Sequence, residues 1–447
     1  MRLTLRHPNF VSGLILATSM ILHLPSQAEV WQLQLNGKRL VANQANKADQ
    51  LIQEVVAQEE LSYDTLGQFI WSTQTRWPGG IEFRYRQTAT LSGSDTIDLL
   101  KWRDGLDISH KDAEQTRKDF ADLAFYHPQL LRANLSELQE IQSPASTKQR
   151  RWQFKDAAGR PAQMLTTLDG QTIVEASNAN FSYHYQSQAA GAKNAALHLQ
   201  VKRGEQLVAD WQLQILPGAA LSAEQFKLAD DYQPKPERGP LRISQLAAGV
   251  YRLDGTASGY HTGIVVGSNS IAIFDAPINP EQAQLAKAAI QARFPGVPIR
   301  HLIISHAHRD HISGVPAYAD AALKIYGGSR AKLALQRQLG EKIAAQVQEV
   351  DQVSEIDLGQ RTIHLLPLAS SHAEEMLVAY DAQSQTIFQG DLFYLPELGP
   401  VPPAFPVGIE LKQLIQKHHL AVQHIVGVHG RTASYAEFQQ GLNLVQP

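Results

Sequence analysis

One short stretch of the chain carries an unusual density of potential metal ligands: His301-Leu302-Ile303-Ile304-Ser305-His306-Ala307-His308-Arg309-Asp310-His311. An apolar run typical of a buried strand leads directly into four imidazole or carboxylate side chains. His306 and His308 can point to the same side of an extended segment, and Asp310 and His311 follow closely enough to turn toward a second point nearby. We therefore expect this one loop to supply ligands to two metal ions.

Three later segments place further potential ligands at or near the ends of apolar strands. Strands are expected at residues 362–367, 376–380, 386–389 and 424–428. His372 lies between the first two, Asp391 follows the third in Gln389-Gly390-Asp391, and His429 follows the fourth. Side chains at strand ends, on loops held by a rigid sheet, are the usual components of a functional site.

In this order the motifs resemble those of the metallo-β-lactamase superfamily. His306-Ala307-His308-Arg309-Asp310-His311 is similar to its H-x-H-x-D-H signature, and Gly390-Asp391 is similar to its G-D motif. The resemblance implies an α/β fold, an αββα sandwich in the C-terminal half, with the metals at one edge. It also implies a ligand set: His306, His308 and His372 for the first metal, Asp310, His311 and His429 for the second, and Asp391 as the bridge.

The resemblance further implies an enzyme, a metal-dependent hydrolase. Two cations about 3.5–4 Å apart can hold a hydroxide between them at neutral pH, and this nucleophile would attack a small-molecule ester, lactone or lactam. The chain has no cysteine, so imidazole and carboxylate must bind the metal. With His308 where iron-containing relatives carry glutamate, two zinc ions are expected, and iron or manganese are the alternatives.

Two other functions stay open at this stage. A persulfide dioxygenase, which resembles the same motif, would hold a single iron. A non-catalytic periplasmic binding module would retain the metal site for folding alone.

The residues expected to act in the chemistry are Asp310, Asp391 and Tyr394. Tyr394 stands three residues after Asp391, an offset that resembles the acyl-homoserine-lactone lactonases of the superfamily, in which the phenol faces the substrate. Packing at the mouth of the core is the alternative for Tyr394. Arg431 is either an anion clamp for the substrate or an exposed charge, and His261 either lines the pocket or is structural.

Asp275 ends an apolar run, Ala272-Ile273-Phe274-Asp275. It matches the acidic residue that the family places beside the site. A carboxylate there can orient a ligating imidazole from behind.

A domain boundary is expected in the proline-rich segment at 232–240. Before it, residues 29–235 form a strand-rich α+β domain of open role, with helical spacing at 47–59 and 111–126 and strand patterns at 81–90, 151–154, 171–175, 196–201 and 207–216. After it, residues 241–447 form the catalytic domain, with strands at 263–266, 271–274 and 301–304 and helices at 280–294 and 329–347.

The first 28 residues are typical of a secretory signal peptide. Arg2 and Arg6 precede an apolar run, and Ser26-Gln27-Ala28 offers small residues for cleavage. A membrane anchor is the alternative, but the run is shorter than the roughly 20 residues that span a bilayer. We expect a periplasmic or secreted protein without stable membrane insertion. A net charge of −3 with dispersed Lys and Arg argues against a nucleic-acid partner.

Overall fold

The computed structural model describes residues 30–42, 52–64, 68–90, 96–102, 105–111, 113–141, 148–187, 196–216, 218–227, 240–254, 260–277, 279–328 and 331–445. The expected signal peptide lies outside the described residues, as does the expected boundary segment up to residue 239. Both therefore stay predictions.

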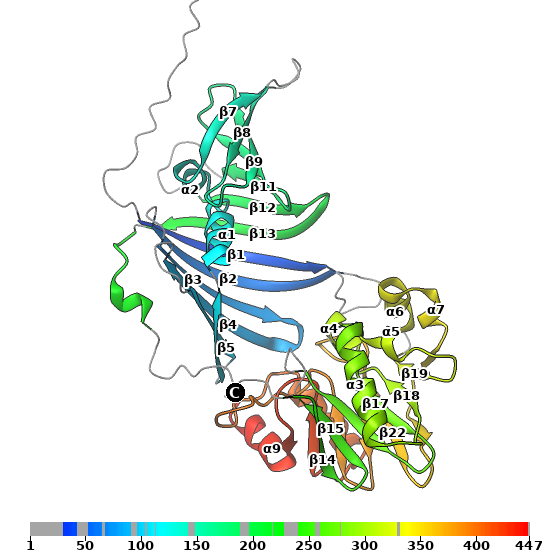
Figure 1. Cartoon of the computed structure of the whole chain (residues 1–447). Helices are drawn as coiled ribbons and strands as arrows, with labels where there is room; N and C mark the ends of the chain where they lie inside the picture. The colour runs from blue at the N-terminus through cyan, green and yellow to red at the C-terminus, as the bar shows by residue number, and fades with distance from the viewer. Residues whose placement is uncertain are drawn as a thin grey trace, which may run out of the picture.

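One large antiparallel sheet forms the N-terminal half, shown in blue to green in Figure 1. Strands β1 to β6 run outward in sequence order, and β7 to β13 return so that β13 pairs with β1 and Leu213 faces Leu35. The strand bounds are β1 Val30–Ala42, β2 Ile52–Asp64, β3 Gln68–Trp77, β4 Ile81–Thr90, β5 Thr96–Trp102, β6 Gly105–Lys111, β7 Ser136–Ile141, β8 Gln149–Lys155, β9 Pro161–Thr167, β10 Ile173–Ser177, β11 Ser182–Ser187, β12 Leu197–Arg203 and β13 Gln206–Leu216.

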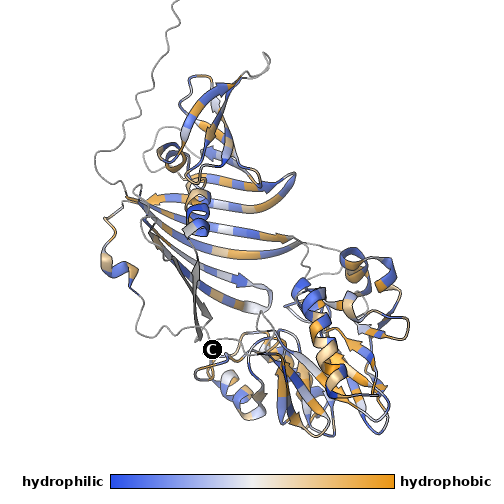
Figure 2. Ribbon diagram, viewed as in Figure 1, coloured by the Kyte–Doolittle hydropathy of each residue, from blue (hydrophilic) through white to orange (hydrophobic). Residues whose placement is uncertain are grey.

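Two helices, α1 (Ala113–Ala124) and α2 (Pro128–Ala133), cover the apolar face of this sheet. Phe120 of α1 stacks on Tyr63 of β2 with ring centroids 4.4 Å apart, and Phe125 stacks on Tyr183 of β11 at 4.9 Å. Figure 2 shows hydrophilic and hydrophobic residues alternating along these strands, as expected for a sheet with one buried face. The N-terminal half thus has its own apolar core.

The helix predicted at 47–59 is wrong, because residues 52–59 belong to strand β2. Alternate residues of β2 point into the core, but two of these inward positions are the polar Gln53 and Glu59. Arg39 and the indole Nε1 of Trp71 both donate to the Glu59 carboxylate, which makes its burial tolerable. Polar residues at buried positions interrupt the alternation of apolar and polar residues from which a strand is predicted, so the sequence did not indicate this one.

Two further sheets make up the C-terminal half. The seven-stranded sheet contains β14 Arg242–Ala247, β15 Val250–Asp254, β16 Thr262–Val266, β17 Ile271–Phe274, β18 Ile299–Ile303, β19 Lys324–Gly327 and β20 Val347–Glu349. The six-stranded sheet contains β21 Ser354–Asp357, β22 Thr362–Leu368, β23 Met376–Asp381, β24 Thr386–Gln389, β25 His424–Gly427 and β26 Ala433–Ser434.

These sheets pack face to face, with helices on their outer sides. Phe274 of β17 and Phe388 of β24 meet in the core between the sheets, with ring centroids 5.9 Å apart. A second core joins the seven-stranded sheet to helix α3 through Ile290, and a third, here called the α8–α9 core, joins the six-stranded sheet to α8 and α9 through Leu411 and Phe438. The layers are those of the αββα sandwich expected from the sequence.

The helices of this half are α3 Pro280–Arg293, α4 Arg309–Ile312, α5 Val315–Tyr318, α6 Ala331–Leu339, α7 Glu341–Ala344, α8 Gly408–Lys417 and α9 Tyr435–Asn443. The single helix predicted at 329–347 is wrong, because Gly340, at φ 91°, separates α6 from α7 and β20 begins at Val347. A positive φ of this size favours glycine and cannot continue a right-handed helix. None of the helices in the described ranges is both long and apolar enough to cross a membrane.

Candidate metal centre

The seven candidate ligands gather at one edge of the sandwich. His306 and His308 lie in the loop after β18, while Asp310 and His311 occupy the short helix α4. The other three come from the six-stranded sheet: His372 from the loop between β22 and β23, Asp391 just after β24, and His429 just after β25. The loop holds its place partly because Gln338 of α6 donates to the carbonyl of Ala307 at 2.9 Å.

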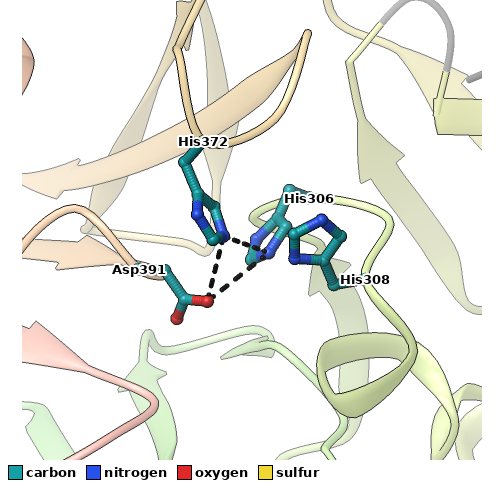
Figure 3. Close-up of side chains that lie close together, drawn as sticks. All are labelled: His306, His308, His372 and Asp391. Atoms are coloured by element: carbon teal, nitrogen blue, oxygen red, sulfur yellow. Dashed lines mark hydrogen bonds and ion pairs between the residues drawn. The ribbon is translucent and has the colours of Figure 1, made fainter. Parts of the chain in front are cut away.

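A first group consists of His306, His308, His372 and Asp391, whose ligand atoms all lie within 4.8 Å of one another. Figure 3 shows the four side chains converging, with His372 Nε2 3.3 Å from His306 Nε2 and 3.1 Å from Asp391 Oδ2. Three imidazole nitrogens and a carboxylate oxygen form a set typical of a zinc site.

Asp310, His311 and His429 form a second group, again with ligand atoms within 4.8 Å of one another. Asp391 also faces this group, because its other oxygen, Oδ1, lies 3.2 Å from His311 Nε2 and 3.4 Å from His429 Nε2. The two oxygens of one carboxylate thus point to different histidine groups. This is the position that a bridging ligand requires.

The buried polar atoms of the cluster fit metal ions better than they fit one another. His308 Nε2, His311 Nε2 and Asp391 Oδ1 are buried and make no hydrogen bond within the described part of the chain. Leaving such atoms without a partner is costly, so each of the two groups calls for a ligand that binds its own buried atoms. Cations meet that requirement, because imidazole nitrogens and carboxylate oxygens can donate electron pairs to them.

Burial and neighbouring charges keep the first group ready to bind a cation. Burial lowers the pKa of His306 well below its usual value, and it lowers the pKa of His308 to about 3. Burial alone would raise the pKa of Asp391, but His311 and His429 hold it well below its usual value. Neutral imidazole and ionised carboxylate are the forms that bind metals.

The second group attracts positive charge. Burial would lower the pKa of His311, but the nearby carboxylates of Asp391 and Asp310 raise it well above its usual value. Burial would raise the pKa of Asp310, yet His311 and His429 lower it. A bound cation would replace the proton that the carboxylates hold on His311.

Asp275 orients one ligand from behind, as the sequence predicted. His311 Nδ1 donates to Asp275 Oδ2 at 2.9 Å, and the backbone and hydroxyl of Ser305 donate to the same carboxylate at 2.7 and 2.6 Å. Asp275 is fully buried, and its φ of 58° turns the chain out of β17 so that its carboxylate meets the ligand loop. Aspartate is one of the few residues that tolerate this backbone region.

The site opens to solvent on the side of the second group. The side chains of Asp310 and His429 are 29% and 20% exposed, whereas those of His306 and His311 are 0% exposed. At this opening the hydroxyl of Tyr260 donates to Asp310 Oδ2 at 3.3 Å, and the ring of Tyr260 lies 4.4 Å from that of His429. Solvent therefore reaches the candidate ligands on the side where Tyr260 lies.

Tyr394 lies beside the loop that carries His429. Its half-buried ring packs against the α8–α9 core, and a Cβ built on Gly430 would meet the ring at 2.7 Å. The position fits the packing role, and the substrate-facing role stays a prediction.

Arg431 and His261 both have partners in the protein. Arg431, 28% exposed, pairs with Glu437 at 2.8 Å, so its charge is already balanced within the protein. His261 is buried and lies 3.0 Å from Asp254 Oδ1 and 2.9 Å from Glu397 Oε1, which agrees with a structural role.

Three residues that contact the candidate ligands were not predicted from the sequence. Tyr260 and Ser305 stand next to residues that the motifs singled out, His261 and His306, so their neighbours gave a local signal. Pro78 gave none: its carbonyl accepts a hydrogen bond from His372 Nδ1 at 3.0 Å, across 294 positions of sequence. The pair Pro78-Gly79 indicates a turn, but nothing in it indicates a metal centre.

A comparison with protein families found a match within the C-terminal half. Residues 255–426 match the family model described as the metallo-beta-lactamase superfamily. The C-terminal domain belongs to this superfamily. No curated protein matches the chain.

Among solved structures, a metallo-beta-lactamase from Pontibacter korlensis is 15% identical with a TM-score of 0.38, over 46% of this chain and 98% of that one. A metallo-beta-lactamase from Hirschia baltica is 20% identical with a TM-score of 0.37, over 47% of this chain and 99% of that one. A stereoselective inverting sec-alkylsulfatase from Pseudomonas sp. is 12% identical with a TM-score of 0.37, over 45% of this chain and 41% of that one.

Proposed function

We propose that the protein is an exported dizinc hydrolase that cleaves a small-molecule ester, lactone or lactam. The position of Asp391 carries the proposal, because its two oxygens face two separate histidine groups at 3.1 and 3.2 Å. A site for a single ion does not need a second group of one aspartate and two histidines on the other side of the same carboxylate. The proposed export rests on the signal-peptide pattern of the first 28 residues.

In this proposal His306, His308 and His372 would hold the first zinc, Asp310, His311 and His429 would hold the second, and Asp391 would contribute to both. Two zinc ions in such a site would lower the pKa of a shared water toward 7, which supplies a hydroxide nucleophile at neutral pH. Asp310 and Asp391 are ionised, so they balance the charge of the cations and can accept the proton released during attack. Tyr394 would donate a hydrogen bond to the oxygen on which negative charge develops.

Esters and lactones fit the surroundings of the site better than β-lactam drugs do. A β-lactam carboxylate needs a cation near the metals, but Leu392-Phe393-Tyr394-Leu395 follows Asp391 without one. Arg431, the alternative clamp, is already paired with Glu437. A neutral carbonyl substrate requires no such clamp.

The test combines a metal count with a substrate panel. Purified protein is analysed for zinc, iron and manganese, then stripped with a chelator, reloaded with zinc and assayed against esters, lactones, lactams and phosphodiesters. We expect close to two zinc ions per chain, and carbonyl hydrolysis that chelation abolishes and zinc restores. One tightly bound iron would favour the dioxygenase instead, and two zinc ions without any hydrolysis would favour a binding module.

A further inference from the structure

The N-terminal half touches the metal centre through one tight turn. This turn, Pro78–Gly80, joins strands β3 and β4 of the large sheet. His372 Nδ1 donates to the carbonyl of Pro78 at 3.0 Å, and the backbone N–H of Val407 donates to the carbonyl of Gly79 at 3.1 Å. One half of the chain thus contacts a ligand of the other half.

Apolar side chains on both sides of the turn hold it against the C-terminal domain. Ile81, 6% exposed, is a member of the α8–α9 core, and Trp77 and Phe83 pack against that core. Trp77 and Phe83 also contact each other edge to face, with ring centroids 6.0 Å apart. The turn is therefore seated by buried hydrophobic contacts, so its carbonyl groups have fixed positions.

The backbone of the turn suits this close approach. Gly79 and Gly80 have φ values of 81° and 72°, a region that favours glycine. A Cβ on Gly79 would lie 3.0 Å from the Cβ of His372 and 3.2 Å from that of Val407. Only glycine lets the chain pass this near to the histidine while Pro78 presents its carbonyl.

We propose that this turn is a positioning element of the metal centre, supplied by the N-terminal domain. The carbonyl of Pro78 accepts a hydrogen bond from Nδ1–H of His372, which fixes the tautomer and leaves the lone pair on Nε2. Nε2 then faces the first group, 3.1 Å from Asp391 Oδ2 and 3.3 Å from His306 Nε2. The inference rests on the proposed metal centre and is independent of the substrate.

The same task is performed for the second group by a residue of the catalytic domain. There Asp275 accepts a hydrogen bond from Nδ1–H of His311 at 2.9 Å. Partners of this kind fix the orientation of a ligating imidazole, and their loss typically costs about 10- to 100-fold in metal affinity or activity. Because Pro78 belongs to the N-terminal sheet, that sheet becomes part of the first metal site.

The test replaces Gly79 in the full-length protein and measures zinc binding with a competing chelator. Gly79→Ala would push the turn away from His372, and we expect the affinity for one of the two zinc ions to fall by about 10- to 100-fold. Gly159→Ala is the matched control, because Gly159 has a similar φ of 75° in a turn of the same sheet, and its Cβ would have no described heavy atom within 4 Å. This control should bind both ions as the parent does.

Two outcomes would overturn the inference. Unchanged affinity for both ions in Gly79→Ala would show that the turn does not position His372. Equal loss of both ions, together with a melting temperature well below that of Gly159→Ala, would assign the turn to folding alone. Zinc binding is measured without substrate. If the substrate panel contradicts the hydrolase proposal, the binding result for Gly79→Ala can therefore still be interpreted.

A measurement on the unmodified protein avoids any question of folding. In the zinc-loaded parent, the ¹⁵N-correlated spectrum of the imidazoles should show a proton on Nδ1 of His372 that exchanges slowly with solvent. His372→Gln identifies the signal by its disappearance. A His372 resonance with Nδ1 unprotonated would contradict the assigned hydrogen bond to Pro78.

Discussion

Asp275 accepts a hydrogen bond from Nδ1 of His311 at 2.9 Å, although the two residues are 36 positions apart in the chain. Both side chains are fully buried, with exposed fractions of 0%. The pair ties the end of strand β17 to helix α4. The pair therefore fixes the position of His311, in the second group, relative to the seven-stranded sheet.

Asp275→Asn should weaken zinc binding at the second group. Asparagine keeps the size of the side chain, but its amide oxygen carries no negative charge. The hydrogen bond that it accepts from His311 is therefore weaker, and the imidazole is held less firmly. We expect the affinity for one zinc ion to fall by about 10- to 100-fold, as measured by chelator competition. Asp156→Asn is the control, because Asp156 is also a buried carboxylate, 3% exposed, but lies in the N-terminal sheet paired with Arg160. Equal effects of the two substitutions would refute the prediction.

Loss of single ligands should separate the two metals only in part. Asp310→Ala removes a ligand of the second group, and His306→Ala removes one of the first. We expect Asp310→Ala to lose mainly the second zinc and His306→Ala to disturb the first. Because Asp391 faces both groups, each loss should also weaken the other ion. Zinc analysis of the dialysed variants checks this, and identical metal loss in both would show a single shared site.

The clustering of the seven candidate ligands could be predicted because its signals are local. Four ligands stand within one loop, and the other three follow apolar strands that a period-based reading finds. The structure brings all seven together. The contact from Pro78 could not be predicted, because it depends on how two separately patterned halves pack, and a backbone carbonyl leaves no mark in the sequence.

The fold, too, includes strands that the sequence predicted and one that it did not. Strand β24 lies at Thr386–Gln389, where the sequence predicted a strand, because all four residues are buried and its two central residues, Ile387 and Phe388, are apolar. Strand β2 was missed because Gln53 and Glu59 occupy inward positions. Glu59 is tolerated there only through Arg39 and Trp71, which lie on the neighbouring strands β1 and β3. Long-range pairing of this kind overrides the local pattern.

A network of charges surrounds the buried side chain of His261. His261 contacts the carboxylates of Asp254 and Glu397, and Arg252 also pairs with Asp254 at 2.6 Å. Burial would lower the pKa of His261, but Asp254 and Glu397 together raise it above the usual value. Burial would likewise raise the pKa of Asp254, and His261 and Arg252 instead hold it at about 2.

This network gives a stability that depends on pH. Because the pKa of His261 is higher in the folded state, its contribution is complete below the unfolded value of about 6.5 and is lost as pH rises through the folded value. We expect His261→Gln to lower the urea midpoint most at pH 6, and to differ less from the parent as pH increases to 9. His364→Gln is the control, because His364 is 32% exposed and pairs with an exposed glutamate. A deficit that is constant across this range would contradict the prediction.

Tyr394→Phe tests whether the phenol acts on the substrate. The substitution keeps the ring that packs against the α8–α9 core and removes only the hydroxyl. A donor to the developing oxyanion in a screened site typically contributes about a hundredfold or more to kcat, so we expect kcat for a lactone or ester to fall about a hundredfold, with zinc content and melting temperature unchanged. Tyr260→Phe is the comparison, because it removes a different hydroxyl, the one that donates to Asp310 at the opening of the site. Activity within about twofold of the parent would assign Tyr394 to packing, because a deleted oxyanion donor cannot leave kcat intact.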